Sequence, residues 1–169
     1  MTADSQLRPD EADLDTRWLE PDEQRAWRSF ITGVTALFEK LDRELRDAHG
    51  VSLAEYELMV RLSEAAGHSL RMAELAASVS HSRSRTTHTI SRMERAGIVA
   101  RGACSEDGRG VVAVLTDAGY RLLQEAARTH VAGVRRHLVD RAEPADFQAM
   151  GRVFDAVKAS GTLPPYDDL

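Results

Sequence analysis

The sequence predicts a single, mainly α-helical domain with one small β-hairpin, and three observations predict it. The chain has 169 residues, the length of one ordinary domain. Over most of that length apolar residues recur at three- and four-residue spacing, as they do on helices that bury one face. Two short β-rich runs, IVARGAC and VVAVLT, flank the polar loop SEDGRG. With 43% hydrophobic and 29% charged residues, the chain has the composition of a globular protein with a real core.

The composition and the motif inventory exclude several classes of protein. No apolar run approaches the ~20 residues that cross a bilayer, and the acidic N-terminus lacks the apolar stretch of a signal peptide. A single cysteine, Cys104, excludes an internal disulfide and a multi-cysteine zinc site. The motifs GxSxG, GxxxxGK[ST], HExxH and CxxC do not occur. We therefore expect a cytoplasmic protein that is not an enzyme, has no metal or cofactor and does not bind a membrane.

The charge is distributed unevenly along the chain. The net charge of −5 by itself argues against binding to nucleic acid, because such proteins are usually basic. Residues 1–25, however, contain eight acids and three arginines, which account for that entire charge. Residues 81–101 contain five arginines and one glutamate. Residues 81–101 are therefore strongly basic, although residues 26–169 as a whole are neutral.

The ends of the chain are expected to lie outside the domain that residues 21–160 form. Residues 1–20 are rich in acids and poor in apolar residues, which predicts a mobile acidic arm, and residues 161–169 predict a tail. A long amphipathic helix is predicted over residues 21–50. Its apolar stripe consists of Trp27, Phe30, Ile31, Val34, Leu37, Phe38, Leu41 and Leu45.

Three shorter helices follow in residues 51–96. Ser52 and Glu55, three residues apart, form a capping box that opens the first of them. Apolar spacing predicts a two-turn helix over residues 72–79. After the break SVSHS, a further helix is predicted over residues 82–96, and Gly97 ends it as the residue after the C-cap.

The C-terminal part of the chain is predicted to form the hairpin and two more helices. Thr116 caps the first of these, whose apolar stripe is about 24 residues long and ends at Leu138, and Pro144 suits the first position of the second. Residues 21–50 and 117–160 thus carry apolar stripes too long for one small domain to cover. Because such faces need a partner, we expect them to be dimerisation helices that pair with a second copy of the chain.

Residues 51–116 have the element order of a winged helix-turn-helix: a short helix, a tight turn, a second helix and a hairpin that serves as the wing. On a helical wheel Thr86, Ile90 and Met93 point inward. The opposite face carries short hydroxyls and arginines, which suit phosphates and the edges of bases in a major groove. The predicted DNA contacts on this helix are Arg83, Ser84, Arg85, Thr87, His88, Arg92 and Arg95.

The segments MAELAASVSHSRSRTTHTISRMERAGIVARG and DGRGVVAVLTDAG resemble the MarR family of winged-helix transcriptional regulators, and the resemblance spans roughly residues 25–160. It implies a homodimer on a pseudo-palindromic operator, with one recognition helix in each major groove. It also implies that Arg109, held by Asp107, enters the adjacent minor groove. Repression relieved by a small aromatic or anionic ligand, or by cysteine oxidation, is a further implication.

The residues around Cys104 bear on the sensing mechanism, and Thr86 bears on the packing of the recognition helix. Glu106 and Asp107 lie close to Cys104 and disfavour its thiolate, which makes a ligand the expected signal. Thr86 stands where the family usually has an aliphatic residue. The ligand is expected between the dimerisation helices and the winged domain, near Phe30, Tyr56 and Met59.

The alternatives to a ligand-released repressor are a winged helix used only for protein contacts, a redox-sensing regulator that uses Cys104, and an enzyme without a known motif. Salt separates the first alternative from DNA binding, because each neutralised phosphate adds about −0.9 to the slope of log K against log salt. Asp42, Glu44 and Glu125 lie among arginines on the predicted helices and are expected to form solvated ion pairs.

Overall fold

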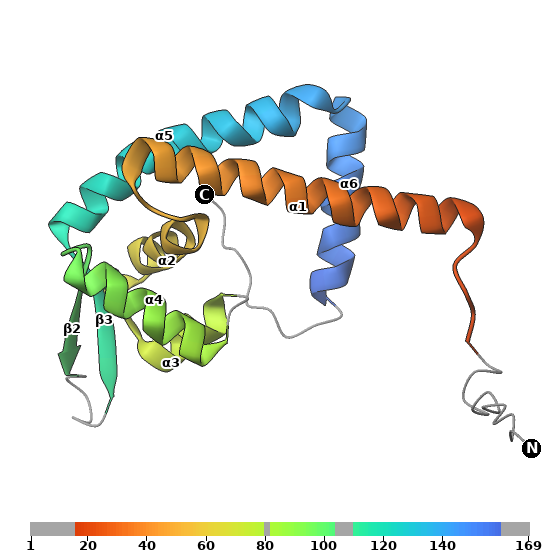
Figure 1. The fold of residues 1–169 in the computed structure, drawn as a ribbon. Coiled ribbons are helices and arrows are strands. Elements are labelled where there is room, and N and C mark those ends of the chain that lie inside the picture. The colour runs from red at the N-terminus through yellow and green to blue at the C-terminus, as the bar shows by residue number, and fades with distance from the viewer. Residues whose placement is uncertain (1–15, 80–81, 104–109, 160–169) are drawn as a thin grey trace, which may run out of the picture. The chain divides into compact units, whose positions relative to one another are not determined.

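The computed structural model describes residues 16–79, 82–103 and 110–159, which form the helices and strands of Figure 1. The elements in chain order are α1 (Pro21–His49), α2 (Leu53–Glu64), β1 (Ser69–Arg71), α3 (Met72–Ser78), α4 (Arg83–Arg95), β2 (Val99–Ala103), β3 (Val111–Leu115), α5 (Asp117–His137) and α6 (Pro144–Ala159). Short 3-10 turns at 66–68 and 139–141 follow α2 and α5. The mainly α-helical fold with a small sheet is the predicted fold class.

The chain divides into two compact units, residues 1–36 and residues 37–169. In the first unit the rings of Trp27 and Phe30 contact each other, with centroids 5.8 Å apart, yet both side chains remain exposed. The predicted apolar stripe of α1 is therefore real, but its N-terminal part is largely uncovered within this chain.

The core of the second unit lies between the helix-turn-helix, the sheet and the first half of α5. Its fully buried side chains come from every one of these elements and from the last turns of α1. The largest are Leu45, Leu58, Met59, Leu62, Leu75, Ile90, Met93, Val99 and Thr86. Burying each of these side chains except that of Thr86, which is polar, contributes about 1.5–3 kcal/mol, so this cluster supplies most of the driving force for folding.

The sheet has three antiparallel strands in the order β1-β3-β2, where the sequence predicts two. Strand β2 pairs with β3 from Val99↔Leu115 to Ala103↔Val111, which is the predicted hairpin. Strand β1 pairs with the other edge of β3, from Ser69↔Val114 to Arg71↔Val112. Because β1 has three residues and continues directly into α3, it is too short to show the alternation that marks a strand.

The predicted helix ends are confirmed at Ser52, Gly97 and Pro144, and Thr116 caps α5 as predicted. The Ser52 amide donates to Glu55 Oε2 over 2.8 Å and the Glu55 amide donates to Ser52 Oγ over 3.2 Å, which is a complete capping box. Gly97 has a φ of 72° after the end of α4, a left-handed conformation that favours glycine. Pro144 is the first residue of α6. Helix α5, by contrast, ends at His137, because Leu138 leaves helical geometry and starts the 3-10 turn.

Thr116 joins four elements of the second unit. Its hydroxyl oxygen accepts a hydrogen bond from the Gly119 amide over 3.0 Å, which caps α5. The same hydroxyl lies 2.8 Å from the Gly97 carbonyl oxygen, to which it donates. Its amide donates to the Ile98 carbonyl oxygen over 3.1 Å. The end of β3 and the start of α5 are thus tied to the turn between α4 and β2.

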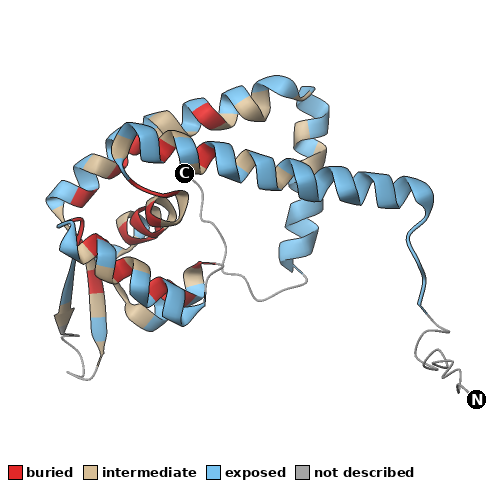
Figure 2. Ribbon diagram, viewed as in Figure 1, coloured by how far each residue is buried: buried red, intermediate tan, exposed pale blue. Residues whose placement is uncertain are grey.

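Helices α1, α5 and α6, called the outer helices below, carry large apolar side chains that are exposed. Figure 2 shows α6 mostly in the pale blue of exposed residues. None of the 16 residues of α6, all of them described, is buried. The exposed large side chains of α5 and α6 are Tyr120, Val131, Val153, Phe154 and Val157. No helix in the described part of the chain is long and apolar enough to span a membrane.

Candidate nucleic-acid interface

Helix α4 has one face fixed in the core and the other in solvent. Thr86, Ile90 and Met93 are buried to 1%, 0% and 0% exposure, which is the predicted inward face. Ser82 caps the helix by accepting a hydrogen bond from the Arg85 amide over 3.3 Å. All seven residues predicted to contact DNA are classed as exposed on this helix: Arg83, Ser84, Arg85, Thr87, His88, Arg92 and Arg95.

Arg92 is held from the side by helix α2. Its Nε donates to Glu55 Oε1 over 2.7 Å, and the Glu55 side chain is 7% exposed. Burial alone would raise the pKa of the Glu55 carboxyl, but the hydrogen bonds from Arg92 and Ser52 outweigh burial and lower that pKa. Glu55 therefore remains ionised and fixes Arg92 beside the first turn of α2. The sequence placed Arg92 next to the groove-facing surface without revealing this partner.

Arg101 is a part of this surface that the sequence analysis did not single out. It projects from β2 and its Nη2 donates to Ser91 Oγ over 2.7 Å and to the Thr87 carbonyl oxygen over 3.2 Å. Its Nη1 also lies 3.4 Å from Glu94 Oε2. One arginine thus clamps the middle of α4 to the sheet. A residue-by-residue helical wheel does not show such a contact, because the two residues come from different elements.

The wing residues predicted to act in DNA binding or sensing lie outside the described residues. Strands β2 and β3 are described up to Ala103 and from Val111, with their hydrogen-bonded register. Cys104, Asp107 and Arg109 fall between the strands, in the part of the chain that is not described. The structure accordingly tests the strands that carry the wing and leaves the roles of these three residues as predictions.

The three residues predicted to bind a ligand lie in different surroundings. Phe30 belongs to the first unit and is 36% exposed, whereas Met59 is fully buried in the core of the second. Tyr56 packs against that core, and its ring centroid lies 4.6 Å from that of His130 on α5. Burial lowers the pKa of the His130 imidazole, whose Nδ1 has no hydrogen-bond partner among the described residues.

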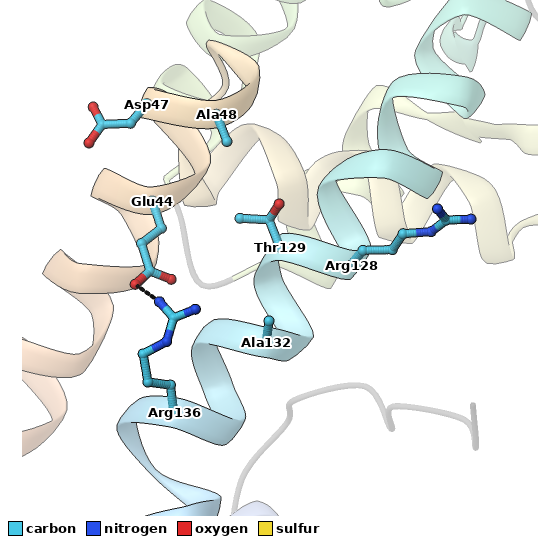
Figure 3. A pocket seen from close by; sticks show the side chains of 7 residues that line it. All are labelled: Glu44, Asp47, Ala48, Arg128, Thr129, Ala132 and Arg136. Carbon is cyan, nitrogen blue, oxygen red and sulfur yellow. Dashed lines mark hydrogen bonds and ion pairs between the residues drawn. The ribbon is translucent and has the colours of Figure 1, made fainter.

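An open cavity of about 580 Å³ lies between α1 and α5. Figure 3 shows the residues that line it, with Glu44, Asp47 and Ala48 on α1 and Arg128, Thr129, Ala132 and Arg136 on α5. None of the three residues predicted to bind a ligand belongs to its lining.

Glu44, at the edge of this cavity, connects the two helices. Its Oε1 lies 2.8 Å from both Arg136 Nη1 and His137 Nε2. The bond from His137 lowers the pKa of the Glu44 carboxyl, and Arg136 adds to this effect against the opposing effect of burial. Asp42 likewise bonds to Arg46 and accepts from the Leu53 amide. These two acids are thus more than solvated ion pairs, because they join separate helices.

The described residues contain no candidate metal site. Among them, no group of three or more His, Cys, Asp or Glu side chains is placed to hold a metal ion. The polar groups on and around α4 are instead donors, mainly guanidinium and hydroxyl groups. Guanidinium groups recognise phosphates and the O6 and N7 atoms of guanine.

Comparison with known proteins identifies the family. Residues 51–111, which cover the helix-turn-helix and the start of β3, match the sequence model of the MarR family. Among curated proteins, none matches this chain. Two solved structures from Streptomyces coelicolor, however, are similar to it over most of its length.

Sco3205, a MarR family transcriptional regulator solved in complex with DNA, is 38% identical, with a TM-score of 0.81, and the match covers 90% of this chain and 95% of that one. AbsC, another MarR family regulator, is also 38% identical, with a TM-score of 0.80 and coverages of 86% and 97%. The organohalide-sensing regulator RdhR-CbdbA1625, in its 2,4-dichlorophenol-bound form, shares the fold at 15% identity, with a TM-score of 0.76 and full coverage of both chains.

The identity to the two Streptomyces regulators extends well beyond the winged segment and includes the outer helices. It agrees with the winged helix-turn-helix, the cationic recognition helix and the uncovered apolar helices found in this chain. Proteins of this family are dimeric DNA-binding regulators. The chain belongs to the MarR family of transcriptional regulators.

Proposed function

We propose that this protein is a sequence-specific repressor that binds a pseudo-palindromic operator as a homodimer, with α4 of each subunit in a major groove. The observation that carries the proposal is the asymmetry of α4: three side chains anchor one face in the core, while arginines and hydroxyls occupy the other. A helix fixed in this way presents its hydrogen-bond donors without moving relative to the rest of the second unit. Sco3205, the similar regulator solved in complex with DNA, supports DNA binding by this chain. Such a regulator acts in the cytoplasm.

The assignment of α4 is tested with Arg85→Ala and His88→Ala on an operator selected from random DNA. If Arg85 reads guanine, its removal costs about 1–3 kcal/mol of binding and relaxes selectivity at one base pair. Arg121→Ala, an exposed arginine on α5, is the matched control. Fluorescence anisotropy on the selected operator and on unrelated DNA measures both quantities. Unchanged binding by both α4 variants would reject this helix as the reader.

For the wing we propose that Arg109 enters the minor groove and that Asp107 orients its guanidinium. The support is the Asp-x-Arg pattern of the resemblance and the paired strands that lead to it. A narrow A·T-rich minor groove attracts an arginine through its negative potential. Arg109→Ala is expected to weaken operator binding and reduce the salt slope by about one or two units for the dimer, without lowering the melting temperature. If Asp107→Ala tightened binding, charge alone would govern the wing.

We further propose that a small aromatic or anionic ligand releases the operator, and that within the second unit it binds near Tyr56 and Met59. The ring contact between Tyr56 and His130 supports an aromatic ligand, since it already brings together two rings from different helices. RdhR-CbdbA1625, which shares the fold, binds 2,4-dichlorophenol. Operator release by 2,4-dichlorophenol and by benzoate, measured in wild type and Tyr56→Ala, tests this site.

Oxidation of Cys104 is the competing signal. It predicts that peroxide releases the operator and that Cys104→Ser abolishes the response. A ligand-only mechanism predicts that wild type and Cys104→Ser behave alike in peroxide. The two mechanisms therefore separate in a single release assay.

A further inference from the structure

A hollow of about 320 Å³ lies beside the recognition helix, where the end of α1 and the start of α2 meet α4. Its lining includes the polar side chains of Asp42, Arg46, Ser52, Arg85, His88 and Arg92. Three arginines against Asp42 in the lining and Glu55, which bonds to Arg92 from outside it, leave a net charge of +1 before His88 is counted. The hollow is therefore built for negative charge.

Two of the arginines are held in place by carboxylates. Arg46 Nε donates to Asp42 Oδ2 over 2.6 Å, and Arg92 Nε donates to Glu55 Oε1 over 2.7 Å. A guanidinium group has five N–H donors, and each of these bonds uses the one on Nε. The terminal amino groups of both arginines thus keep donors for a further acceptor, while the rotation of each side chain is already restricted. An anion that binds here loses less rotamer entropy than one that must order free arginines.

Asp42 also ties the hollow to the backbone of α2. Its Oδ1 accepts from the Leu53 amide over 2.8 Å, so one carboxylate orients Arg46 and fixes the corner between α1 and α2. Burial alone would raise the pKa of the Asp42 carboxyl, but the bonds from Arg46 and Leu53 outweigh burial and lower it. Arg46 is therefore held by a carboxylate at the same hollow that Arg85 and Arg92 of α4 line.

We propose that this hollow seats one backbone phosphate of the bound DNA, with Arg46 as a phosphate contact and Asp42 as its positioning residue. The proposal rests on the proposed function, because the phosphate is that of the operator read by α4. Arg85 and His88 belong to both the hollow and the exposed face of α4, so a strand that meets this face also meets the hollow. The contact fixes the register of the helix and carries no base sequence information.

The first test compares Arg46→Ala with Arg43→Ala, a nearby exposed arginine of α1 that does not line the hollow. Arg46→Ala is expected to weaken binding by the same factor on the selected operator and on unrelated DNA. It should also make the salt slope less negative by about 0.9 per hollow, or about 1.8 for a dimer. Arg43→Ala should leave both unchanged, and Arg46→Lys should restore most of the slope. Circular dichroism checks that each variant is folded.

Asp42→Asn tests the positioning role, since it removes the charge and keeps a side chain of nearly the same size. If Asp42 orients Arg46, this variant binds DNA more weakly although it is more positive. Tighter binding would overturn that role. A salt slope unchanged by Arg46→Ala, or a loss confined to one sequence, would overturn the phosphate contact. Failure of the proposed function itself is distinct, because wild type would then show no sequence-selective binding to DNA.

A free anion is the other source of a phosphate group. Inorganic phosphate, titrated at constant ionic strength against the wild-type complex, is expected to displace the operator no better than sulfate does. Displacement at micromolar phosphate that Arg46→Ala abolishes would make the hollow a small-anion site and overturn its assignment to DNA.

Discussion

The helix-turn-helix body and the outer helices carry equally regular apolar patterns, but they bury them very differently. In the body, the inward residues of α2, α3 and α4 are nearly all removed from solvent. On α6 the pattern recurs at the same spacing, yet Val153 is 60% exposed and Val157 is 57% exposed. An amphipathic stripe thus predicts that a helix face will be buried, but it does not predict which element or which chain will cover that face. The apolar face of the helix-turn-helix is buried within one chain, whereas those of the outer helices are not, and we expect a second copy of the chain to cover them.

The largest effect is expected from a charge placed on the uncovered apolar face of α6. Val153→Asp would bury an unpaired carboxylate in each half of the interface, at a cost of about 3 kcal/mol or more per site. We expect the dimer, twice 18.7 kDa, to dissociate and operator binding to be lost. Sedimentation equilibrium at micromolar concentration measures the mass. Gln148→Asp, at an exposed polar position of the same helix, is the control and should remain dimeric.

The next largest effect is expected where the body is most tightly packed. A Cβ added at Gly119, in the first turn of α5, would collide with the carbonyl oxygen of Ile98. Because that oxygen belongs to the backbone, Gly119→Ala should lower the free energy of unfolding by about 2–3 kcal/mol. Urea denaturation measures the loss, with the exposed neighbour Ala118→Ser as a control within about 0.5 kcal/mol of wild type. Equal stability of the two variants would contradict the close approach.

A smaller effect of opposite sign is expected at Thr86. Its side chain is 1% exposed, and its Oγ1 has no hydrogen-bond partner among the described residues. Since an unsatisfied buried hydroxyl costs about 1 kcal/mol or more, Thr86→Val should stabilise the body by about that amount. Thermal and urea denaturation measure it. DNA affinity should not change, because Thr86 faces away from the exposed side of α4; Thr86→Val that destabilises would show an unrecognised bond.

The smallest expected effect is a pH dependence from His130. Burial lowers the pKa of His130 in the folded protein, so the unfolded chain takes up a proton first as the pH falls below the ordinary value of 6.5. The stabilisation by the neutral ring is present above that value and is lost as the pH falls towards the folded-state pKa. His130→Phe keeps an aromatic ring beside Tyr56 and should flatten the fall in unfolding free energy between about pH 7 and pH 5.5. Parallel curves for the two proteins would contradict this.

Sequence reasoning predicted local structure well wherever one segment carries its own signal. Ser52 with Glu55, Gly97 and Pro144 each mark a helix end through the chemistry of that residue, and each was placed correctly. Strand β1 was missed because its stability comes from the edge of β3, more than 40 residues away in the chain. A three-residue segment cannot show a period of two, so no local pattern marked it.

The candidate site divides in the same way. The exposed face of α4 followed from helical periodicity, because inward and outward positions depend only on the spacing along one helix. The bonds of Arg92 to Glu55 and of Arg101 to Ser91 did not, since they join residues from different elements. The hollow beside α4 needed the same long-range information. Arg46, 39 residues before Arg85, has nothing in its own neighbourhood that assigns it to this surface.

The Thr116 hydroxyl group connects the turn at the end of α4 to the first turn of α5. Its hydroxyl accepts from the Gly119 amide and lies 2.8 Å from the Gly97 carbonyl oxygen. The helix that ends at that turn is the one proposed to read DNA, and the helix that begins at Thr116 carries exposed apolar side chains further along, such as Val131. If α4 reads DNA, one hydroxyl group therefore connects the proposed DNA-binding helix to the start of α5, and Thr116→Val would remove both hydrogen bonds at once.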